Sequence, residues 1–82
     1  MLKVDRKLNF IKKIGKIKDN SHKQQIKKLI RKIILNPLLG KPMRYARKGT
    51  REVYLGPFRL SYVYIKHEDK IVLFDLYHKD EQ

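Results

Sequence analysis

The stretch that decides the fold is residues 50–65, TREVYLGPFRLSYVYI. On both sides of Gly56-Pro57 the side chains alternate with a period of two residues, which is typical of β-strands. Glycine and proline next to each other favour a turn between such strands. We therefore predict strands at Thr50–Leu55 and Phe58–Ile65, joined as a hairpin.

The alternation resumes after a charged turn, Lys66–Lys70, and predicts a third strand at Ile71–Tyr77. Two hairpins in series make an antiparallel meander, in which successive side chains point to opposite faces. The face expected to pack against helices carries Val53, Leu55, Phe58, Leu60, Tyr62, Tyr64, Val72, Phe74 and Leu76. The opposite face is expected to carry Glu52, Tyr54, Arg59, Ser61, Val63, Ile65, Asp75, Tyr77 and, by parity, Lys79.

Before the meander, the hydrophobic period changes to that of α-helices. Apolar residues at helical spacing predict a first helix from Arg6 to about Ile17, with Asp5 as its N-cap. The segment Ser21–Gln24 fits a capping box, and it precedes a second amphipathic helix that ends before Pro37.

These segments predict an α+β fold. Residues 1–82 are expected to form a single domain, because a chain of this length buries one core only. In this domain an N-terminal helical hairpin packs on the antiparallel β-meander of three strands. Met1–Val4 is expected to add a short edge strand or to fray.

The charge of the chain points to an anionic partner. Lys and Arg number 21 against 8 Asp and Glu, and the net charge is +13. Residues 1–51 carry +15 and residues 52–82 carry −2. A polyanion is the expected partner, since each neutralised phosphate releases counterions. Nucleic acid or the ribosome fits this charge best, with an anionic membrane surface or an acidic protein as the alternatives.

Several other classes of protein do not fit the composition. The chain has no cysteine, which excludes a disulfide scaffold and a thiolate site. His22 and His67 have no ligand at metal-binding spacing, so neither a metal nor another cofactor is expected. No apolar run is long enough to cross a bilayer and no signal peptide is recognisable, so the cytoplasm is the expected location.

A basic loop lies between the second helix and the first meander strand. Glycine and proline at Gly40, Pro42 and Gly49 predict irregular backbone there. The candidate RNA-binding residues of this loop are Lys41, Arg44, Arg47, Lys48 and Arg51.

Three short motifs resemble the RelE/ParE toxins of toxin–antitoxin modules. They are Asn36-Pro37 followed by Gly40-Lys41-Pro42, then Gly56-Pro57-Phe58-Arg59-Leu60-Ser61-Tyr62, and the ending Phe74-Asp75-Leu76-Tyr77-His78-Lys79. The resemblance extends over essentially the whole chain, and the order of predicted elements agrees with it. The "GKP" and "YH" elements are closer to the RelE and YoeB branches than to ParE.

The resemblance implies a ribosome-dependent endoribonuclease that cleaves messenger RNA without a metal. The 2′-hydroxyl is the nucleophile of such a reaction, which needs a base, cations around the phosphorane and an acid for the 5′ oxygen. It also implies a cognate RelB-like antitoxin, expected to wrap the toxin with acidic amphipathic segments, and contacts of the basic helices with ribosomal RNA.

Four residues are the candidate catalytic groups. Arg59 matches the arginine of the family and lies on the polar face of the predicted sheet, where it either binds phosphate or pairs with Glu52 or Asp75. His78 and Lys79 match the family's terminal basic pair, and Tyr77 precedes them.

The sequence departs from the family at several positions. Glu52 and Tyr54 occupy positions that are commonly basic, Met43 stands where the YoeB-like branch has glutamate, and a tyrosine beyond the terminal basic pair has no counterpart. The general base therefore stays open between Glu52 and Tyr77. Two other functions compete: a ParE-like inhibitor of DNA gyrase, and a catalytically degenerate relative that binds RNA or the ribosome.

Overall fold

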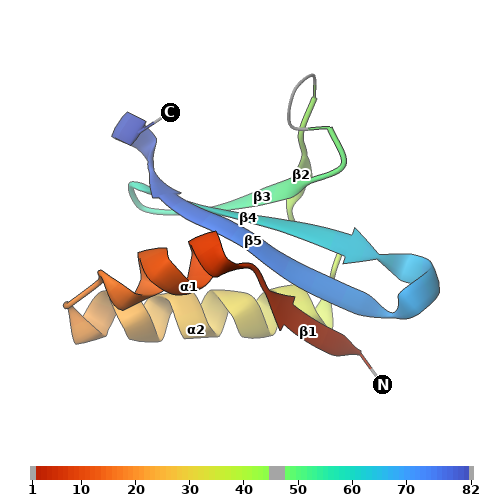
Figure 1. The fold of residues 1–82 in the computed structure, drawn as a ribbon, viewed down its shortest axis with the longest axis horizontal. Coiled ribbons are helices and arrows are strands. Elements are labelled where there is room, and N and C mark those ends of the chain that lie inside the picture. Colours follow the sequence, from red (N-terminus) through yellow and green to blue (C-terminus); the bar gives the residue numbers. More distant parts are fainter. Residues whose placement is uncertain (1, 45–47, 82) are drawn as a thin grey trace.

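Two helices lie side by side against one face of a sheet (Figure 1). The structure, a computed structural model, describes residues 2–44 and 48–81. Its helices and main strands are β1 (Lys3–Arg6), α1 (Leu8–Gly15), α2 (Asn20–Leu35), β2 (Lys41–Pro42), β3 (Arg51–Leu55), β4 (Phe58–Ile65) and β5 (Lys70–His78). Two short 3-10 helices flank β5: η2 (Lys66–Glu68) before it and η3 (Lys79–Glu81) after it.

Within the described residues, five strands form one sheet in the order β1-β5-β4-β3-β2. The pairs β2–β3, β3–β4 and β4–β5 are antiparallel, whereas β1 runs parallel to β5. The predicted α+β fold and the antiparallel meander are confirmed. The face of the sheet turned away from α1 and α2, upward in Figure 1, is called the reverse face below.

The core fills the space between the helices and the sheet. α1 contributes Phe10, which is 1% exposed, while Leu8 and Ile11 of the predicted stripe stay 63% and 48% exposed. The stripe of α2 is buried through Ile26 and Ile33. The sheet supplies the remaining buried members of the core cluster, which are Val53, Leu60, Tyr62, Ile71, Leu73 and Leu76.

A β-bulge corrects the predicted faces of β5. Leu73 pairs with Tyr62 and Asp75 with Ser61, so Phe74 is an additional residue in β5. An additional residue reverses the alternation before it. As a result Leu73 is buried in the core, whereas Phe74 is 42% exposed, and the predictions that Phe74 and Val72 face the helices are wrong.

Both helix starts also differ from the predictions. Lys7 N donates to Leu73 O at 2.9 Å, which continues the strand pairing of β1, and Asp5 lies in β1 instead of capping α1. At α2 the cap is Asp19, whose Oδ1 accepts from Ser21 N at 2.8 Å. A carboxylate at a helix N-terminus gains from the hydrogen bond and from the helix dipole, so Asp19 takes the place predicted for Ser21.

The predicted loop after α2 contains the two-residue strand β2, paired with β3. The buried Tyr62 fixes the chain just before β2, because its hydroxyl donates to Pro37 O and accepts from Gly40 N, both at 2.7 Å. A Cβ on Gly40 would lie 2.8 Å from this hydroxyl oxygen. Glycine is therefore required where the loop approaches β4.

Candidate functional site

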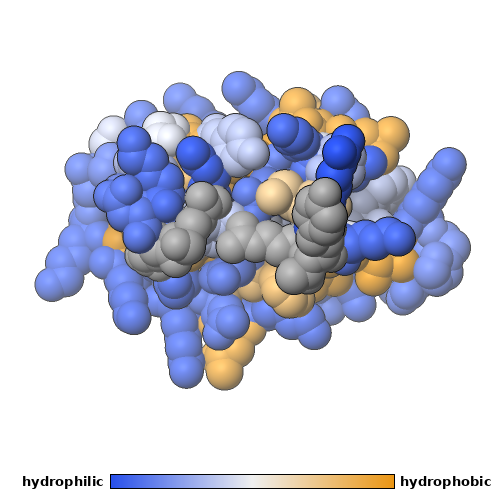
Figure 2. Space-filling model, turned by 90° about the horizontal axis from the view of Figure 1, so that it is seen from above, coloured by the Kyte–Doolittle hydropathy of each residue, from blue (hydrophilic) through white to orange (hydrophobic). Residues whose placement is uncertain are grey.

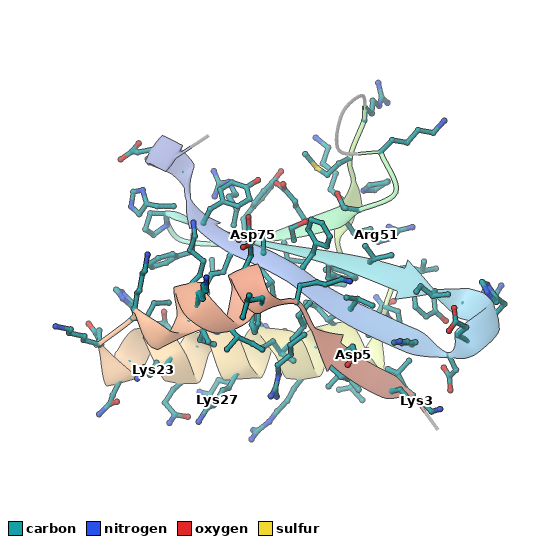
Figure 3. All side chains as sticks on the ribbon, in the orientation of Figure 1. Lys3, Asp5, Lys23, Lys27, Arg51 and Asp75 are labelled. Carbon is teal, nitrogen blue, oxygen red and sulfur yellow. The ribbon has the colours of Figure 1, made fainter. Side chains whose placement is uncertain are left out.

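The reverse face carries two rows of side chains that run across the strands. The register places Tyr54 of β3, Arg59 of β4 and Tyr77 of β5 side by side in one row. The next row is Glu52, Ser61 and Asp75. The predicted polar face is thus confirmed at these six positions. Asp75 lies in the strand layer, whereas Lys23 and Lys27 extend from α2 in the helical layer below (Figure 3).

Arg59 is the central cation of the first row. Its guanidinium carbon lies 4.2 Å from the centre of the Tyr54 ring. Its Nη1 donates to the carbonyl oxygen of Gly56 at 3.3 Å and to that of Phe58 at 3.4 Å. An arginine stacked on an aromatic ring loses little freedom when its other N–H groups bind an anion. The Tyr54 ring and the two carbonyl oxygens therefore hold the Arg59 guanidinium in place on the reverse face.

Tyr77 and Glu52 form a buried pair beside Arg59. The Tyr77 hydroxyl reaches across β4 and donates to Glu52 Oε2. Tyr77 is 8% exposed and Glu52 1% exposed. A buried carboxylate is costly unless it is hydrogen-bonded, so the tyrosine and the glutamate stabilise each other. Of the two candidate bases, Tyr77 is the one in the row of Arg59.

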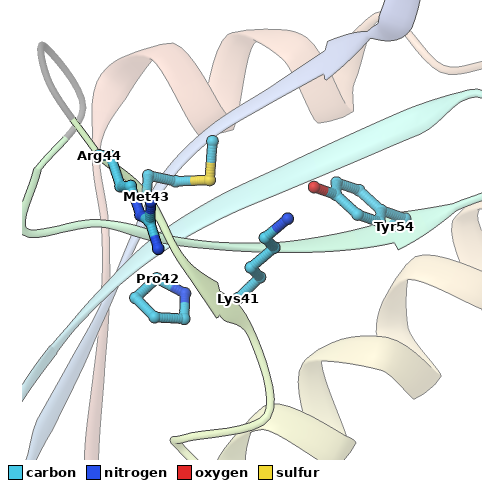
Figure 4. A pocket seen from close by; sticks show the side chains of 5 residues that line it. All are labelled: Lys41, Pro42, Met43, Arg44 and Tyr54. Atoms are coloured by element: carbon cyan, nitrogen blue, oxygen red, sulfur yellow. The ribbon is translucent and has the colours of Figure 1, made fainter.

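A pocket next to this row is formed by the β2 edge. It measures about 610 Å³ and is lined by Lys41, Pro42, Met43, Arg44 and Tyr54. In Figure 4 the amine of Lys41 and the hydroxyl of Tyr54 turn toward each other. The pairing of Lys41 with Glu52 and the bond from Met43 N to Thr50 O, 3.0 Å, hold this edge against β3. Two predicted RNA-binding cations therefore lie next to the Tyr54–Arg59 stack.

The other predicted RNA-binding residues are placed differently. Arg51 Nη1 donates to Gly40 O at 2.7 Å and to Leu38 O at 3.4 Å, so this guanidinium braces the chain before β2. Lys48 is exposed in the turn that precedes β3. Arg47 lies outside the described residues.

The end of β5 separates the remaining catalytic candidates. His78 pairs with Phe58, and their rings meet edge to face at 5.7 Å. Phe58 packs against the core and also meets His22 of α2 at 5.4 Å, which puts His78 on the helical side of the sheet. Lys79 is exposed, and its backbone N donates to Pro57 O at 2.7 Å. Arg59 and Tyr77 thus come together, and His78 lies on the opposite face.

Two features of this site were not predicted from the sequence. They are the stacking of Tyr54 on Arg59, where Tyr54 was only a departure from a basic position, and the burial of Glu52 in its bond with Tyr77. Strand parity already put all four residues on one face. Parity assigns a residue to a face, but it does not predict that the side chain of Tyr77 extends across β4 to Glu52.

The surface seen from above the reverse face is largely hydrophilic, with smaller hydrophobic groups between the charged side chains (Figure 2). Across residues 2–44 and 48–81 no three His, Asp or Glu side chains gather closely enough to share a metal ion. In the same residues no helix has the length and apolar character needed to span a membrane.

The sequence matches one family model over residues 4–82, described as the ParE toxin of the type II toxin–antitoxin system parDE. The chain belongs to this toxin family, within the RelE/ParE superfamily. Every residue of the described site lies inside the matched range. The expected relationship to the RelE/ParE toxins is therefore confirmed.

The toxin also has the fold of several solved structures. The RelBE2 toxin–antitoxin complex from Mycobacterium tuberculosis contains a chain of 20% identity and TM-score 0.81, with 94% of this toxin and 96% of that chain covered. The intact RelBE complex from E. coli gives 16% identity and TM-score 0.74, with coverages of 95% and 96%. YafQ from E. coli gives 17% identity and TM-score 0.76, with coverages of 99% and 97%. No curated protein sequence matches this toxin significantly.

Proposed function

We propose that this toxin is a metal-independent endoribonuclease that cleaves messenger RNA on the ribosome and thereby inhibits translation. The observation that carries the proposal is the guanidinium of Arg59, stacked 4.2 Å above the Tyr54 ring on the face that also carries Tyr77. A preorganised cation of this kind stabilises the charge that develops on a phosphorane. The net charge of +13 supports binding of the toxin to ribosomal RNA, partly through the basic helices.

The proposed reaction transfers the phosphate within the RNA strand. The 2′-oxygen forms a bond to phosphorus, the bond from phosphorus to the 5′-oxygen breaks, and the products are a 2′,3′-cyclic phosphate and a 5′-hydroxyl. Tyr77 accepts the 2′-hydroxyl proton on its oxygen while its own proton passes to Glu52, along the hydrogen bond between them. Arg59 neutralises the phosphorane, and Lys41 and Arg44 hold the neighbouring phosphates.

The leaving 5′-oxygen takes its proton from the end of β5. His78 and Lys79 are the two candidates for this acid, and the exposure of Lys79 favours it over His78, whose ring packs on Phe58. Arg47, Lys48 and Arg51 complete the set of proposed RNA-binding residues. Of these, Arg51 contributes through its hold on the chain before β2.

The test is cleavage in a translating extract. Purified toxin is added, and new 5′ ends in a defined message are mapped by primer extension. Arg59→Ala is expected to reduce cleavage about a hundredfold or more, the range typical for loss of a group that stabilises transition-state charge. Lys66→Ala, which removes one positive charge from the exposed turn between β4 and β5, outside the basic helices and the site, is the control and should leave cleavage within about twofold. Intact messages with the wild-type toxin would refute the enzymatic proposal.

A second function is favoured by the family model, which carries the ParE name. A ParE-like toxin would inhibit DNA gyrase and leave RNA intact. A supercoiling assay with purified gyrase separates the two: inhibition of supercoiling with unchanged messages supports the ParE-like function. A third, catalytically degenerate relative that binds RNA or the ribosome is supported by Glu52 and Tyr54, and it predicts translation arrest without new 5′ ends.

We also propose an antitoxin as the protein partner. The similar chains from M. tuberculosis and E. coli were solved as toxin–antitoxin complexes. A RelB-like antitoxin with acidic, amphipathic segments would complement the charge of this toxin. Because the proposed target is the translating ribosome, we assign the toxin to the cytoplasm.

A further inference from the structure

A second feature of the reverse face lies farther along β4 and β5 from the site. An open cavity of about 350 Å³ is lined there by four apolar side chains, Val63, Ile65, Val72 and Phe74. Phe74 is 42% exposed, although an aromatic ring gains much from burial. We call these four side chains the apolar patch. The proposed cleavage reaction uses none of them.

The patch depends on the β-bulge in β5. Without the additional residue, Phe74 would continue the alternation of Leu76 and enter the core. The bulge instead leaves the ring at the surface, in one cavity with aliphatic side chains of β4 and β5. Bulges commonly re-aim a side chain next to a functional site. An exposed aromatic ring on a sheet offers a flat apolar surface on which another ring can stack.

The size of the patch limits what it can bind. A stable protein–protein interface buries about 1,200–2,000 Å² in total. Four side chains, of which Val72 is only 8% exposed, provide a small part of such an area. The cavity is at the lower end of the range for small-ligand pockets, about 300–1,000 Å³. One planar ring system therefore matches the patch better than a protein surface does.

The polar groups around the patch select among ring systems. Arg6, Lys7, Lys70 and Asp5 also line the cavity, at the edge of the sheet that β1 forms beside β5 (Figure 1). Asp5 and Lys70 pair with each other, with 3.1 Å between Oδ2 and Nζ. The exposed side chains of Arg6 and Lys7 offer hydrogen-bond donors and no acceptor. A ring bound here should therefore present acceptors toward the β1 edge.

A nucleobase meets both requirements. Every base has a π-face that stacks on an aromatic side chain, whatever its identity. The edges of the bases differ, and guanine presents two neighbouring acceptors, N7 and O6, to which arginine and lysine commonly donate. Adenine presents an amino donor beside its N7, and a cation does not pair with that donor. The donors of the rim therefore favour guanine.

We propose that the apolar patch is a subsite for an unpaired guanine of the RNA, stacked on Phe74, with its N7 and O6 accepting from Arg6 and Lys7. The subsite deepens the proposed function and rests on it, because the RNA is the strand bound at Arg59. It would decide which positions of a message are cut.

The distance between the two sites suits a single strand. Arg59 and Val63 point to the same face of β4 and are four residues apart, which corresponds to about 13 Å. A strand held at Arg59 reaches the patch within a few nucleotides. Asp75 lies in the row between them, and its carboxylate oxygens can accept from ribose hydroxyls. A guanine in the patch would thus lie at a fixed distance from the cleaved phosphate.

The binding test uses fluorescein-labelled uridine oligonucleotides of about eight nucleotides, with one central guanine or one central adenine. Their affinity for the toxin is measured by fluorescence anisotropy without ribosomes. We expect guanine to be preferred over adenine about fivefold or more. Phe74→Leu keeps an apolar side chain without the ring and should weaken the guanine oligonucleotide about tenfold. Leu35→Ala, at an 86% exposed leucine of α2, is the control and should change the affinity by less than about twofold.

The rim is tested by selectivity, which separates base contacts from general attraction. The double variant Arg6→Gln, Lys7→Gln should reduce the preference for guanine to less than about twofold. Lys16→Gln, Lys18→Gln removes equal charge from the exposed segment between α1 and α2 and should keep the preference. Thermal unfolding followed by circular dichroism identifies any variant that has lost its fold. If Phe74→Leu is such a variant, Phe74→Met replaces it.

Three binding outcomes would overturn the proposal. They are equal affinity of the wild type for the two oligonucleotides, an unchanged guanine preference in the rim variant, and a Phe74-dependent dimer of the toxin in sedimentation without RNA. The last would mean that a second copy covers the patch.

The mapped 5′ ends in the translating extract are read separately. If the oligonucleotides show a Phe74-dependent preference for guanine but the wild-type toxin cuts no message, the proposed cleavage fails while the guanine subsite stands. If messages are cut, the wild type should cut at a constant spacing from guanine, and Phe74→Leu should still cut but lose this bias. An unchanged bias in Phe74→Leu would place base selection elsewhere and overturn the subsite alone.

Discussion

At the scale of single residues, the site depends on how Arg59 is held. Stacking on Tyr54 and two carbonyl contacts fix a flexible side chain before any ligand arrives. The cost of ordering a long side chain is about 1.5–2 kcal/mol, so a preordered guanidinium binds phosphate with a smaller loss of entropy. A positive charge on a mobile side chain does not have this entropic advantage.

Arg59→Lys separates geometry from charge. The ammonium keeps the positive charge but loses the planar fork and the stacking on Tyr54. We expect RNA binding to weaken by less than about threefold while cleavage falls about tenfold or more. Tyr54→Phe keeps the ring and should leave cleavage nearly unchanged, whereas Tyr54→Ala should resemble Arg59→Lys. Full cleavage by Arg59→Lys would mean that the site needs only a charge.

The two residues at the end of β5 give a second prediction. If Lys79 is the acid, Lys79→Ala should reduce cleavage about a hundredfold, within the range for general acid catalysis. His78→Ala, which removes a ring packed on Phe58 at 5.7 Å, should mainly lower the thermal stability. Cleavage rates and Tm values of both variants decide between them. A large loss of cleavage in His78→Ala with an unchanged Tm would assign the acid to His78.

At the scale of elements, the basic edge of the site depends on the turn before β2. Tyr62 and Arg51 hold this turn from two sides, the first through its hydroxyl and the second through Gly40 O at 2.7 Å. The cations of the β2 edge, Lys41 and Arg44, follow directly. Their positions are thus set by contacts to β3 and β4, although they belong to a nearly irregular segment.

Two glycine substitutions test this support. Gly40→Ala puts a Cβ 2.7 Å from a ring carbon of Tyr62, and we expect a loss of about 1–3 kcal/mol in the free energy of unfolding. Gly15→Ala in α1 meets no atom within 4 Å and should add about 0.5–1 kcal/mol. Urea unfolding measures both. Equal stability of the two variants would contradict the proposed contact between Tyr62 and the turn.

Tyr62 also predicts how stability depends on pH. Burial raises the pKa of Tyr62 above its usual value of 10.0, although the bond from Gly40 N and the charge of Arg51 act in the opposite direction. A phenol with a raised pKa in the folded state keeps its proton while the unfolded chain releases it. Its stabilising contribution is therefore full below pH 10 and is lost above it. Tyr62→Phe should flatten this alkaline part of a plot of Tm against pH, and an unchanged plot would contradict the prediction.

The order of elements could be predicted from the sequence, because hydrophobic periods of two and 3.6 residues are local signals. The bulge at Phe74 could not, since both registers of β5 place apolar residues on the helical face: Val72, Phe74 and Leu76 in one, Ile71 and Leu73 in the other. In the structure Ile71 and Leu73 belong to the buried core cluster together with Phe10, Ile26 and Ile33 of the two helices. Strand β2 was not predicted either. Two residues are too few to show an alternating pattern, and the strand is defined by its pairing with β3, which is distant in sequence.

At the scale of the whole molecule, the positive charge is distributed more widely than the site. The placement of Arg59 on the polar face could be predicted, because the alternation of side chains within a single strand, β4, determines it. Arg51 was grouped with the candidate RNA-binding residues of the loop, yet it braces a turn, because its pairing with Tyr62 puts it on the helical face. Which cations lie on the reverse face depends on contacts between distant segments, so the sequence predicts the total charge better than the placement of each cation.

The dependence of RNA binding on salt distinguishes a specific face from general attraction. If Lys41, Arg44, Lys48 and Arg59 each neutralise one phosphate of a single strand, the logarithm of the affinity should fall with the logarithm of the salt concentration with a slope of about −3. Arg59→Ala should make this slope less steep by about 0.7, because one contact is lost. Lys27→Ala on α2, in the helical layer of Figure 3, is the matched control and should leave the slope unchanged.

The measurement is fluorescence anisotropy of a labelled RNA oligonucleotide at several salt concentrations. A steep slope that responds equally to both variants would mean that the molecule attracts RNA by its net charge and that the reverse face adds no defined phosphate contact.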